Sequence, residues 1–200
     1  MTDNCLENAF EKRRSIYNLG SRKVLPENEI VDIVSAAVKH TPSAFNSQSA
    51  RVVVLFGEHY RKLWNIVLDE LRKIVPADKF AATEAKVRSF MDGYGTVLFF
   101  EDADVVQKLQ ADFPLYKDNF PKWSEQANGM LQFAIWTALA KAGVGASLQH
   151  YNPLIDAAVA SAWNLPSSWK LVAEMPFGSI EAPAGEKSFM PIEERVKVFK

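Results

Sequence analysis

The chain has 200 residues, of which 48% are hydrophobic and 24% are charged, values typical of globular proteins rather than of disordered chains. Its 23 basic and 24 acidic side chains leave a formal net charge of -1, so there is no global basic field to recruit nucleic acid. The length favours a single domain, and we expect residues 1–200 to form it.

Neither a membrane nor an oxidising compartment is indicated. Apolar runs such as 52–56 and 97–100 are too short to span a bilayer. Residues 1–5 lack the basic and apolar regions of a secretory signal, and the single cysteine, Cys5, cannot form an internal disulfide. We therefore expect a cytoplasmic protein that does not associate with membranes.

In chain order, helical periodicity alternates with short β-branched or aromatic runs. The periodicity predicts helices over 4–17, 26–41, 59–75, 78–91, 124–142 and 153–163, with a short helix or loop over 102–111. Strands are predicted at 51–56, 96–100, 146–149, 170–177 and 196–199. Pro26 suits the first position of its helix, and Gly143 suits the position that ends the helix before it. Long helices with dispersed strands indicate an α+β fold with helices flanking a mixed sheet.

The first polar group that can carry chemistry is Arg13-Arg14-Ser15, at the end of the first predicted helix. A guanidinium binds a phosphate through two parallel hydrogen bonds, and the Ser15 hydroxyl adds a further donor. The alternative is a solvated turn whose charge complements the helix dipole. Taken alone, the two arginines favour that alternative.

The second group is the segment 42–48, Pro-Ser-Ala-Phe-Asn-Ser-Gln, between a predicted helix and a predicted strand. Pro, Ser and Asn are turn formers, so the segment can be read as a simple connection. However, the amides of Asn46 and Gln48 both donate and accept, which matches the alternating N–H and C=O groups of a flavin pyrimidine ring.

The third group follows the predicted helix 124–142. Gly143-Val144-Gly145 is not a dinucleotide fingerprint, because it lacks the third glycine and follows a helix rather than a strand. Small residues there either end the helix or let the backbone approach a flat ring.

His40, His59 and His150 show no metal-ligand spacing, so no metal site is expected. Lys187 lies in a predicted loop, where a lysine is usually only solvated.

The order of these segments resembles the nitroreductase family. The resemblance rests on 13–17 (Arg-Arg-Ser-Ile-Tyr), on 42–48 and on the tail around Lys187. The segments 142–153 and 189–199 resemble in particular the branch with the yeast fatty-acid-repression-mutant proteins and the copper-induced lactococcal nitroreductase. The similarity extends over almost the whole chain.

The resemblance implies a nitroreductase-like, mainly antiparallel sheet flanked by helices, in an intertwined homodimer whose C-terminal segments reach across to the partner. It implies two FMN sites at the subunit interface. The FMN-binding residues that it implies are Arg13, Arg14, Ser15, Tyr17, Ser43, Asn46, Gln48, Gln149, His150, Tyr151 and Lys187, with the 43–48 residues supplied by the partner. Many relatives carry a second basic residue two positions after the lysine, where this chain has Phe189.

The implied function is that of an FMN-dependent oxidoreductase. Hydride would pass from NADH or NADPH through the flavin to a nitroaromatic or a quinone by a ping-pong mechanism. The flavin carries the chemistry, so no catalytic side chain is required; Arg14 is the candidate to stabilise the reduced ring, and the alanine-rich helix 124–142 is the candidate dimer core. Two alternatives stay open: a non-catalytic flavin- or ligand-binding regulatory protein on the same fold, and a cofactor-free interaction module that uses the aromatic residues of 113–123. The sequence does not separate NADH from NADPH.

Overall fold

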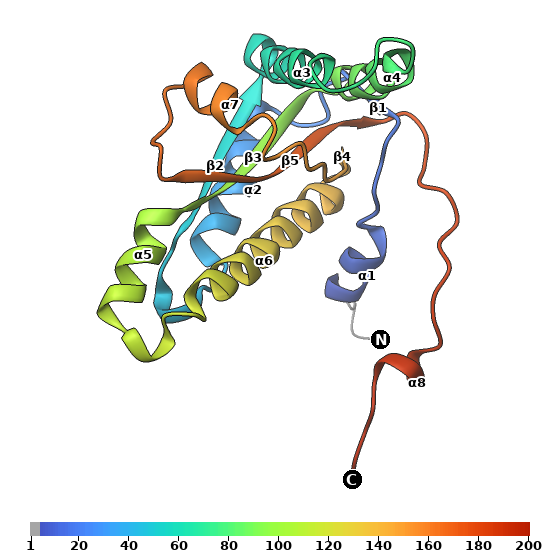
Figure 1. The fold of residues 1–200 in the computed structure, drawn as a ribbon. Coiled ribbons are helices and arrows are strands. Elements are labelled where there is room, and N and C mark those ends of the chain that lie inside the picture. The colour runs from blue at the N-terminus through green and yellow to red at the C-terminus, as the bar shows by residue number, and fades with distance from the viewer. Residues whose placement is uncertain (1–4) are drawn as a thin grey trace.

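The computed structural model describes residues 5–200, in which helices cover both faces of an antiparallel sheet (Figure 1). The sheet order is β1-β5-β3-β2, and β4 also pairs with β5. The strands are β1 Leu19–Gly20, β2 Ala50–Phe56, β3 Gly95–Asp102, β4 Gly145–Ala146 and β5 Trp169–Ile180. All of these strand pairs are antiparallel, and the only parallel contact among the described residues is an isolated bridge between Ser15 and Ala146. The predicted α+β fold is therefore confirmed.

The helices agree with most of the predicted ones and differ at their ends. They are α1 Cys5–Lys12, α2 Glu27–His40, α3 Gly57–Arg72, α4 Phe80–Met91, α5 Ala103–Asp112, α6 Phe120–Lys141, α7 Asp156–Ala162 and α8 Ile192–Arg195, with short 3-10 turns η1 Ala44–Asn46 and η2 Pro114–Tyr116. Gly143 has a φ of 79°, the left-handed conformation expected of a residue that ends a helix. Pro26 is the residue before α2 rather than its first residue.

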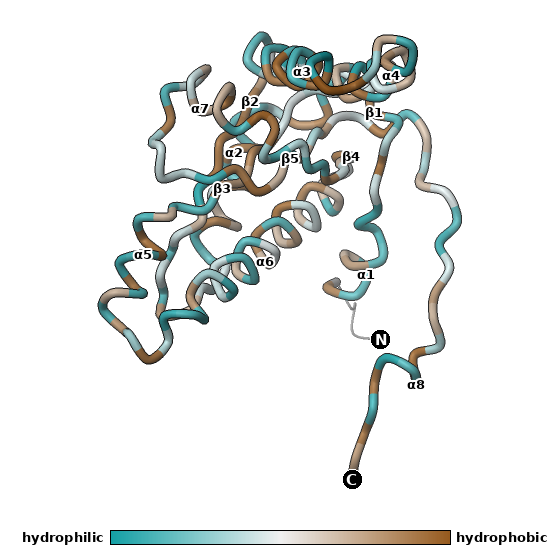
Figure 2. The backbone as a smooth tube through the Cα atoms, viewed as in Figure 1, coloured by the Kyte–Doolittle hydropathy of each residue, from teal (hydrophilic) through white to brown (hydrophobic). Residues whose placement is uncertain are grey.

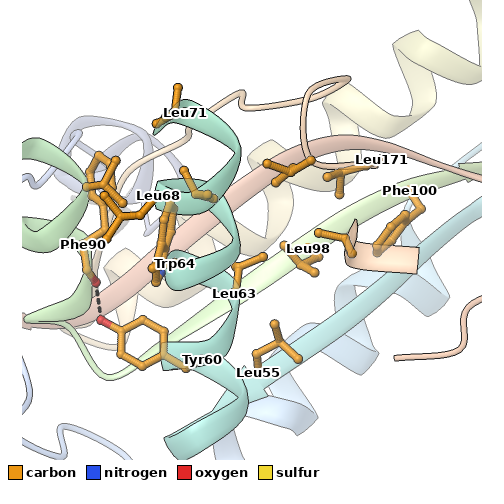
Figure 3. Close-up of a cluster of buried hydrophobic side chains, with 14 residues drawn as sticks. Leu55, Tyr60, Leu63, Trp64, Leu68, Leu71, Phe90, Leu98, Phe100 and Leu171 are labelled. Carbon is orange, nitrogen blue, oxygen red and sulfur yellow. Dashed lines mark hydrogen bonds between the residues drawn. The ribbon is translucent and has the colours of Figure 1, made fainter. Parts of the chain in front are cut away.

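Alternation along the central strand β3 creates two cores. Leu98 and Phe100 point to one face, where they pack with α3, α4 and α7 around Trp64 (Figure 3). Val97 and Phe99 point to the other face, which α2 and α6 cover. Trp64 is fully buried, and its indole N–H donates to the hydroxyl of Thr96 at 3.1 Å. Figure 3 also shows the hydroxyl of Tyr60 bonded to the carbonyl of Phe90, which ties α3 to α4.

The first helix is shorter than predicted. The prediction placed residues 13–17 in a helix, but α1 ends at Lys12 and the chain becomes extended. The amide of Ile16 donates to the carbonyl of Ala146 at 2.9 Å, so a tertiary hydrogen bond replaces a helical one. The predicted helix start at residue 4 lies outside the described residues.

The C-terminal segment also departs from prediction. Residues 196–199 were predicted as a strand, but they form no strand in the described chain, and 181–200 run away from the sheet (Figure 1). Hydrophobic stretches nonetheless occur on this exposed segment (Figure 2), where Val198 is 69% and Phe199 is 93% exposed. Among residues 5–200, no helix combines the length and the apolar character needed to cross a membrane.

Candidate functional site

One segment near each end of the chain lines a cavity of about 440 Å³, which we call the cationic pocket. The residues that line it come from 13–18 and from 182–187, and among them are Arg13, Arg14, Ser15, Tyr17 and Lys187. About 170 positions of sequence thus separate groups that share one cavity. Every predicted site residue near either end of the chain lies here.

The N-terminal half of the cationic pocket is held against the sheet by backbone hydrogen bonds. Ser15 bridges to Ala146, and Leu19 pairs with Ile180 at the end of β5. The amide of Glu181 then donates to the carbonyl of Asn18 at 3.0 Å, just as the chain leaves β5. The loop that carries Lys187 therefore begins beside the segment that carries the arginines.

Arg14 joins the two halves directly. Its Nη2 donates to the carbonyl oxygen of Gly185 at 2.6 Å, two residues before Lys187. A hydrogen bond from a charged donor is stronger than one between neutral groups. We infer that Arg14 fixes the loop, which leaves the other cations of the pocket available to a ligand.

The Arg13 guanidinium is oriented by aromatic rings. Its Cζ lies 4.4 Å from the ring centroid of Trp136 and 5.9 Å from that of Phe133, both on α6. Its Nε is buried and has no hydrogen-bond partner among the described residues. Within residues 5–200, Arg13, Arg14 and Lys187 make no ion pair with a carboxylate. The cationic pocket thus concentrates positive charge that its own carboxylates leave unneutralised.

The segment 42–48 lies elsewhere, beside an apolar cavity of about 560 Å³ that Ser43 and Gln48 help to line. Three of its residues that are not glycine have positive φ values: Phe45 at 56°, Asn46 at 51° and Gln48 at 50°. Such conformations cost roughly 1–3 kcal/mol each and persist only where the surroundings impose them, often at functional sites.

Hydrogen bonds impose this conformation at the end of the segment. The amide of Gln48 donates to the Ser43 hydroxyl at 2.9 Å, and Arg51 Nη1 donates to the Gln48 carbonyl at 2.6 Å. Arg51 is itself held by Asp102 through a 2.9 Å ion pair. Arg51, which the sequence analysis did not single out, is therefore a positioning residue for this loop.

An aromatic cluster holds the middle of the segment. Phe45 packs against the rings of Phe113, Tyr116, Phe120 and Trp123, with centroid separations from 4.8 to 6.2 Å. Each such pair contributes about 0.5–1.5 kcal/mol beyond its buried area, enough in sum to offset the strain at Phe45. Phe45 is still 51% exposed, so this aromatic cluster presents an open face.

The third predicted segment, Gln149 to Tyr151, lies beside Glu174 of β5. The predicted strand 146–149 is only partly formed: β4 ends at Ala146, and Gln149 then makes an isolated antiparallel bridge with Glu174. The amide of Tyr151 donates to Glu174 Oε2 at 2.9 Å. Burial raises the pKa of the Tyr151 phenol to about 12, so its hydroxyl stays protonated at neutral pH.

The structure therefore gathers the predicted residues into three separate places in one chain. Arg13, Arg14, Ser15, Tyr17 and Lys187 share the cationic pocket, whereas Ser43 and Gln48 line the apolar cavity. Asn46 lies on the strained loop between these two residues, and 149–151 lies beside β5. Glu174 was missed, because a single carboxylate within an apolar strand gives no local signal of its role.

Comparison with known proteins identifies the family of the chain. The model of the nitroreductase family matches residues 10–179. Two Saccharomyces cerevisiae proteins are similar: HBN1, whose name assigns it provisionally to the nitroreductases, is 39% identical over 94% of this chain and 93% of its own, and the nitroreductase FRM2 is 36% identical over 92% of each.

A solved structure is more similar still. The nitroreductase CinD from Lactococcus lactis, in complex with nicotinic acid, superposes with a TM-score of 0.91 at 51% identity, covering 98% of this chain and all of that one. These similarities confirm the predicted fold and the predicted branch. The chain belongs to the nitroreductase family, a family of oxidoreductases.

Proposed function

We propose that this protein is an FMN-dependent oxidoreductase that passes hydride from NADH or NADPH to nitroaromatics or quinones by a ping-pong mechanism. The observation that carries the proposal is the cationic pocket, in which Arg13, Arg14 and Ser15 face the loop of Lys187. A structural neighbour from Desulfovibrio desulfuricans, 20% identical with a TM-score of 0.70, is in complex with FMN. That neighbour lends the proposal support at the level of the fold.

The residues present fit the phosphate end of FMN. A phosphate monoester carries nearly two negative charges at neutral pH. Arg13 and Lys187, the two cations of the pocket that are not committed to Gly185, have no carboxylate partners in the described chain. The buried Nε of Arg13 is a donor that still needs an acceptor. The hydroxyls of Ser15 and Tyr17 add neutral donors at the same place.

Each segment would then have one task. FMN, when bound, supplies hydride transfer at its N5 atom. Arg13 and Lys187 would neutralise the phosphate, and Arg14 would hold the loop of Lys187 through Gly185 while its charge favours the reduced ring. Gln149, His150 and Tyr151 would present backbone groups to the ring edge, and Ser43, Asn46 and Gln48 would bind its polar groups.

A homodimer explains why the 43–48 loop lies apart from the cationic pocket of its own chain. A second copy would bring its loop to that pocket and would cover an exposed apolar face on α1 and α6. Phe10 is 45% and Phe133 is 42% exposed on this face, with their rings 5.4 Å apart. The 181–200 segment, with exposed residues such as Phe199, would extend over the partner.

The dimer can be tested on that face. A Phe133→Glu variant is expected to be monomeric by light scattering, whereas the wild type is expected at twice the 22.4 kDa of one chain. A charge at a buried apolar contact strongly disfavours association. The matched control is Ile74→Glu, at a 63% exposed position just beyond α3, which should stay dimeric. A monomeric wild type would exclude the dimer.

The aromatic cluster supports an aromatic oxidant. Its open face is attached through Phe45 to the loop that we assign to the flavin. Flat electron-poor rings stack on aromatic side chains. The similar CinD has been solved in complexes with chloramphenicol and with 4-nitrophenol, both at TM-scores near that of its nicotinic acid complex.

The visible spectrum of the pure protein tests the proposed function. We expect a yellow protein whose flavin is bleached by NADH or NADPH in the absence of oxygen and regains its colour on addition of 4-nitrophenol or a quinone. A colourless protein that takes up no FMN would refute the cofactor assignment. A protein that keeps its flavin but is not reduced by either nicotinamide would instead support the regulatory alternative.

A further inference from the structure

A carboxyl group lies buried behind the segment that we assign to the flavin ring. Glu174 is in the middle of β5, with Leu98 opposite it on β3 and Gln149 opposite it on the other side. Its exposed fraction is 0%, and the residues next to it in β5, Ala173 and Met175, are fully buried as well. A carboxyl group is rarely fully buried unless it has a specific partner.

Its partner is the backbone of 149–151. Gln149 and Glu174 exchange two backbone hydrogen bonds, at 2.7 and 2.9 Å. The Glu174 side chain adds a third, because its Oε2 accepts from the amide of Tyr151 at 2.9 Å. His150 lies between these two fixed points. The Glu174 side chain thus holds the backbone as far as Tyr151, beyond the last backbone pairing at Gln149.

The second oxygen of Glu174 has no partner among the described residues. Two further buried acceptors, Asn152 Oδ1 and Asp156 Oδ1, lack partners there too. A protonated carboxyl supplies a donor, which a carboxylate does not. The charged and titratable groups that face Glu174 are Asp156 from α7 and the Tyr151 phenol, and neither brings a positive charge. Burial raises the pKa of Glu174 to about 8, with Asp156 adding to the shift and the hydrogen bond from the Tyr151 amide opposing it, so the acid is largely neutral at pH 7.

We propose that Glu174 is a positioning residue for the flavin ring: its neutral carboxyl fixes the backbone of 149–151 at the ring edge, and ionisation of the carboxyl loosens that backbone. The inference rests on the proposed function, because the ring is assigned to this segment there. It adds to the proposed function a residue that does not touch the ring, and it makes FMN binding depend on pH. Ionisation acts on the segment because the single hydrogen bond from the Tyr151 amide does not compensate a buried negative charge beside Asp156, and such a charge draws in water.

The test compares the wild type with Glu174→Gln and Glu174→Leu, with the FMN dissociation constant measured by flavin fluorescence at about pH 7 and about pH 9.5, on either side of the Glu174 pKa. Wild-type affinity is expected to fall about tenfold at the higher pH, the net size of one hydrogen bond lost between the loosened backbone and the ring edge. Glu174→Gln keeps a neutral acceptor for the Tyr151 amide, so its affinity should be the same at both values. Glu174→Leu should bind weakly at both.

The stability of the flavin-free protein gives a second readout. The folded chain holds the Glu174 proton more tightly than the unfolded chain, so the stability that this proton confers is complete at low pH and is lost as the pH rises through about 8. The wild-type melting temperature should therefore fall as the pH rises from low values through about 8, and that of Glu174→Gln should not.

The outcomes separate the two ideas. A flavin-binding wild type with the same affinity at both pH values, or with the same pH dependence as Glu174→Gln, overturns the role of Glu174 and leaves the proposed function standing. A pH-dependent melting temperature with pH-independent FMN affinity reduces Glu174 to a structural residue and overturns the inference as well. A wild type that binds no FMN at either pH refutes both the role of Glu174 and the proposed function.

Discussion

An Arg13→Ala variant is expected to bind FMN about ten- to a hundredfold more weakly than the wild type, because it loses charge-assisted hydrogen bonds to the phosphate. The effect should be large because the cationic pocket has little redundancy. Arg14 is committed to the Gly185 carbonyl, and the position two residues after Lys187 is occupied by Phe189, whose ring lies 5.0 Å from the lysine ammonium. The measurement is the flavin-to-protein absorbance ratio after dialysis, followed by titration with FMN.

The loss of packing must be separated from the loss of charge. Arg13 rests on Trp136, so truncation to alanine also removes a cation–π contact and buried stem atoms. Arg13→Met keeps most of the packing and removes the charge together with the N–H donors. It should bind FMN nearly as weakly as Arg13→Ala, while its melting temperature stays close to that of the wild type. Arg88→Ala, which breaks an exposed ion pair with Glu84, is the control for loss of one positive charge. Unchanged flavin occupancy in Arg13→Met would contradict the phosphate assignment.

The segments of the candidate site could be proposed from the sequence because residue type indicates their chemistry. Arginines, a lysine and amides can be recognised as possible ligand-binding residues from their type alone. The end of the helix at Gly143 follows from a backbone preference of glycine, and the positive φ of Gly143 in the structure confirms it. The long helix predicted at 124–142 was found from its periodicity, although it starts earlier, at Phe120, where Pro121 occupies a first-turn position that tolerates proline.

What the sequence could not supply is the set of partners that override local preference. Residues 13–17 have helical spacing, yet Ile16 finds the carbonyl of Ala146, more than a hundred residues away. Residues 196–199 have the alternation of a strand but no strand partner within the described chain. Arg51 and Glu174 look like ordinary polar residues of two strands, and only their contacts with Gln48 and Tyr151 give them a role. Such roles depend on distant pairings that no local pattern encodes.

A Gly178→Ala variant is expected to lose both stability and flavin, because one methyl group would disturb the place where the sheet meets the cationic pocket. The added Cβ would collide with the carbonyl oxygen of Gly20 in β1, and it would lie 3.1 Å from the Cα of Gly93 and from the amide nitrogen of Tyr94. All of these are backbone atoms, so no side chain can swing aside. Overpacking of this kind costs about 1–3 kcal/mol, which lowers the melting temperature by roughly 2–12 °C in a chain of this size.

The loss of flavin follows from the position of β1. This strand continues directly from the 13–18 segment, and it is held to β5 by the pairs of Leu19 with Ile180 and of Gly20 with Ser179. If β1 moves away from Gly178, Arg13 and Arg14 move with it relative to Lys187, so FMN affinity should fall although no ligand-binding side chain has changed. Gly185→Ala is the matched control for stability, because its added Cβ meets no atom within 4 Å, and its melting temperature should equal that of the wild type. A Gly178→Ala protein with wild-type melting temperature and wild-type flavin content would show that β1 does not hold the phosphate end of the site in place.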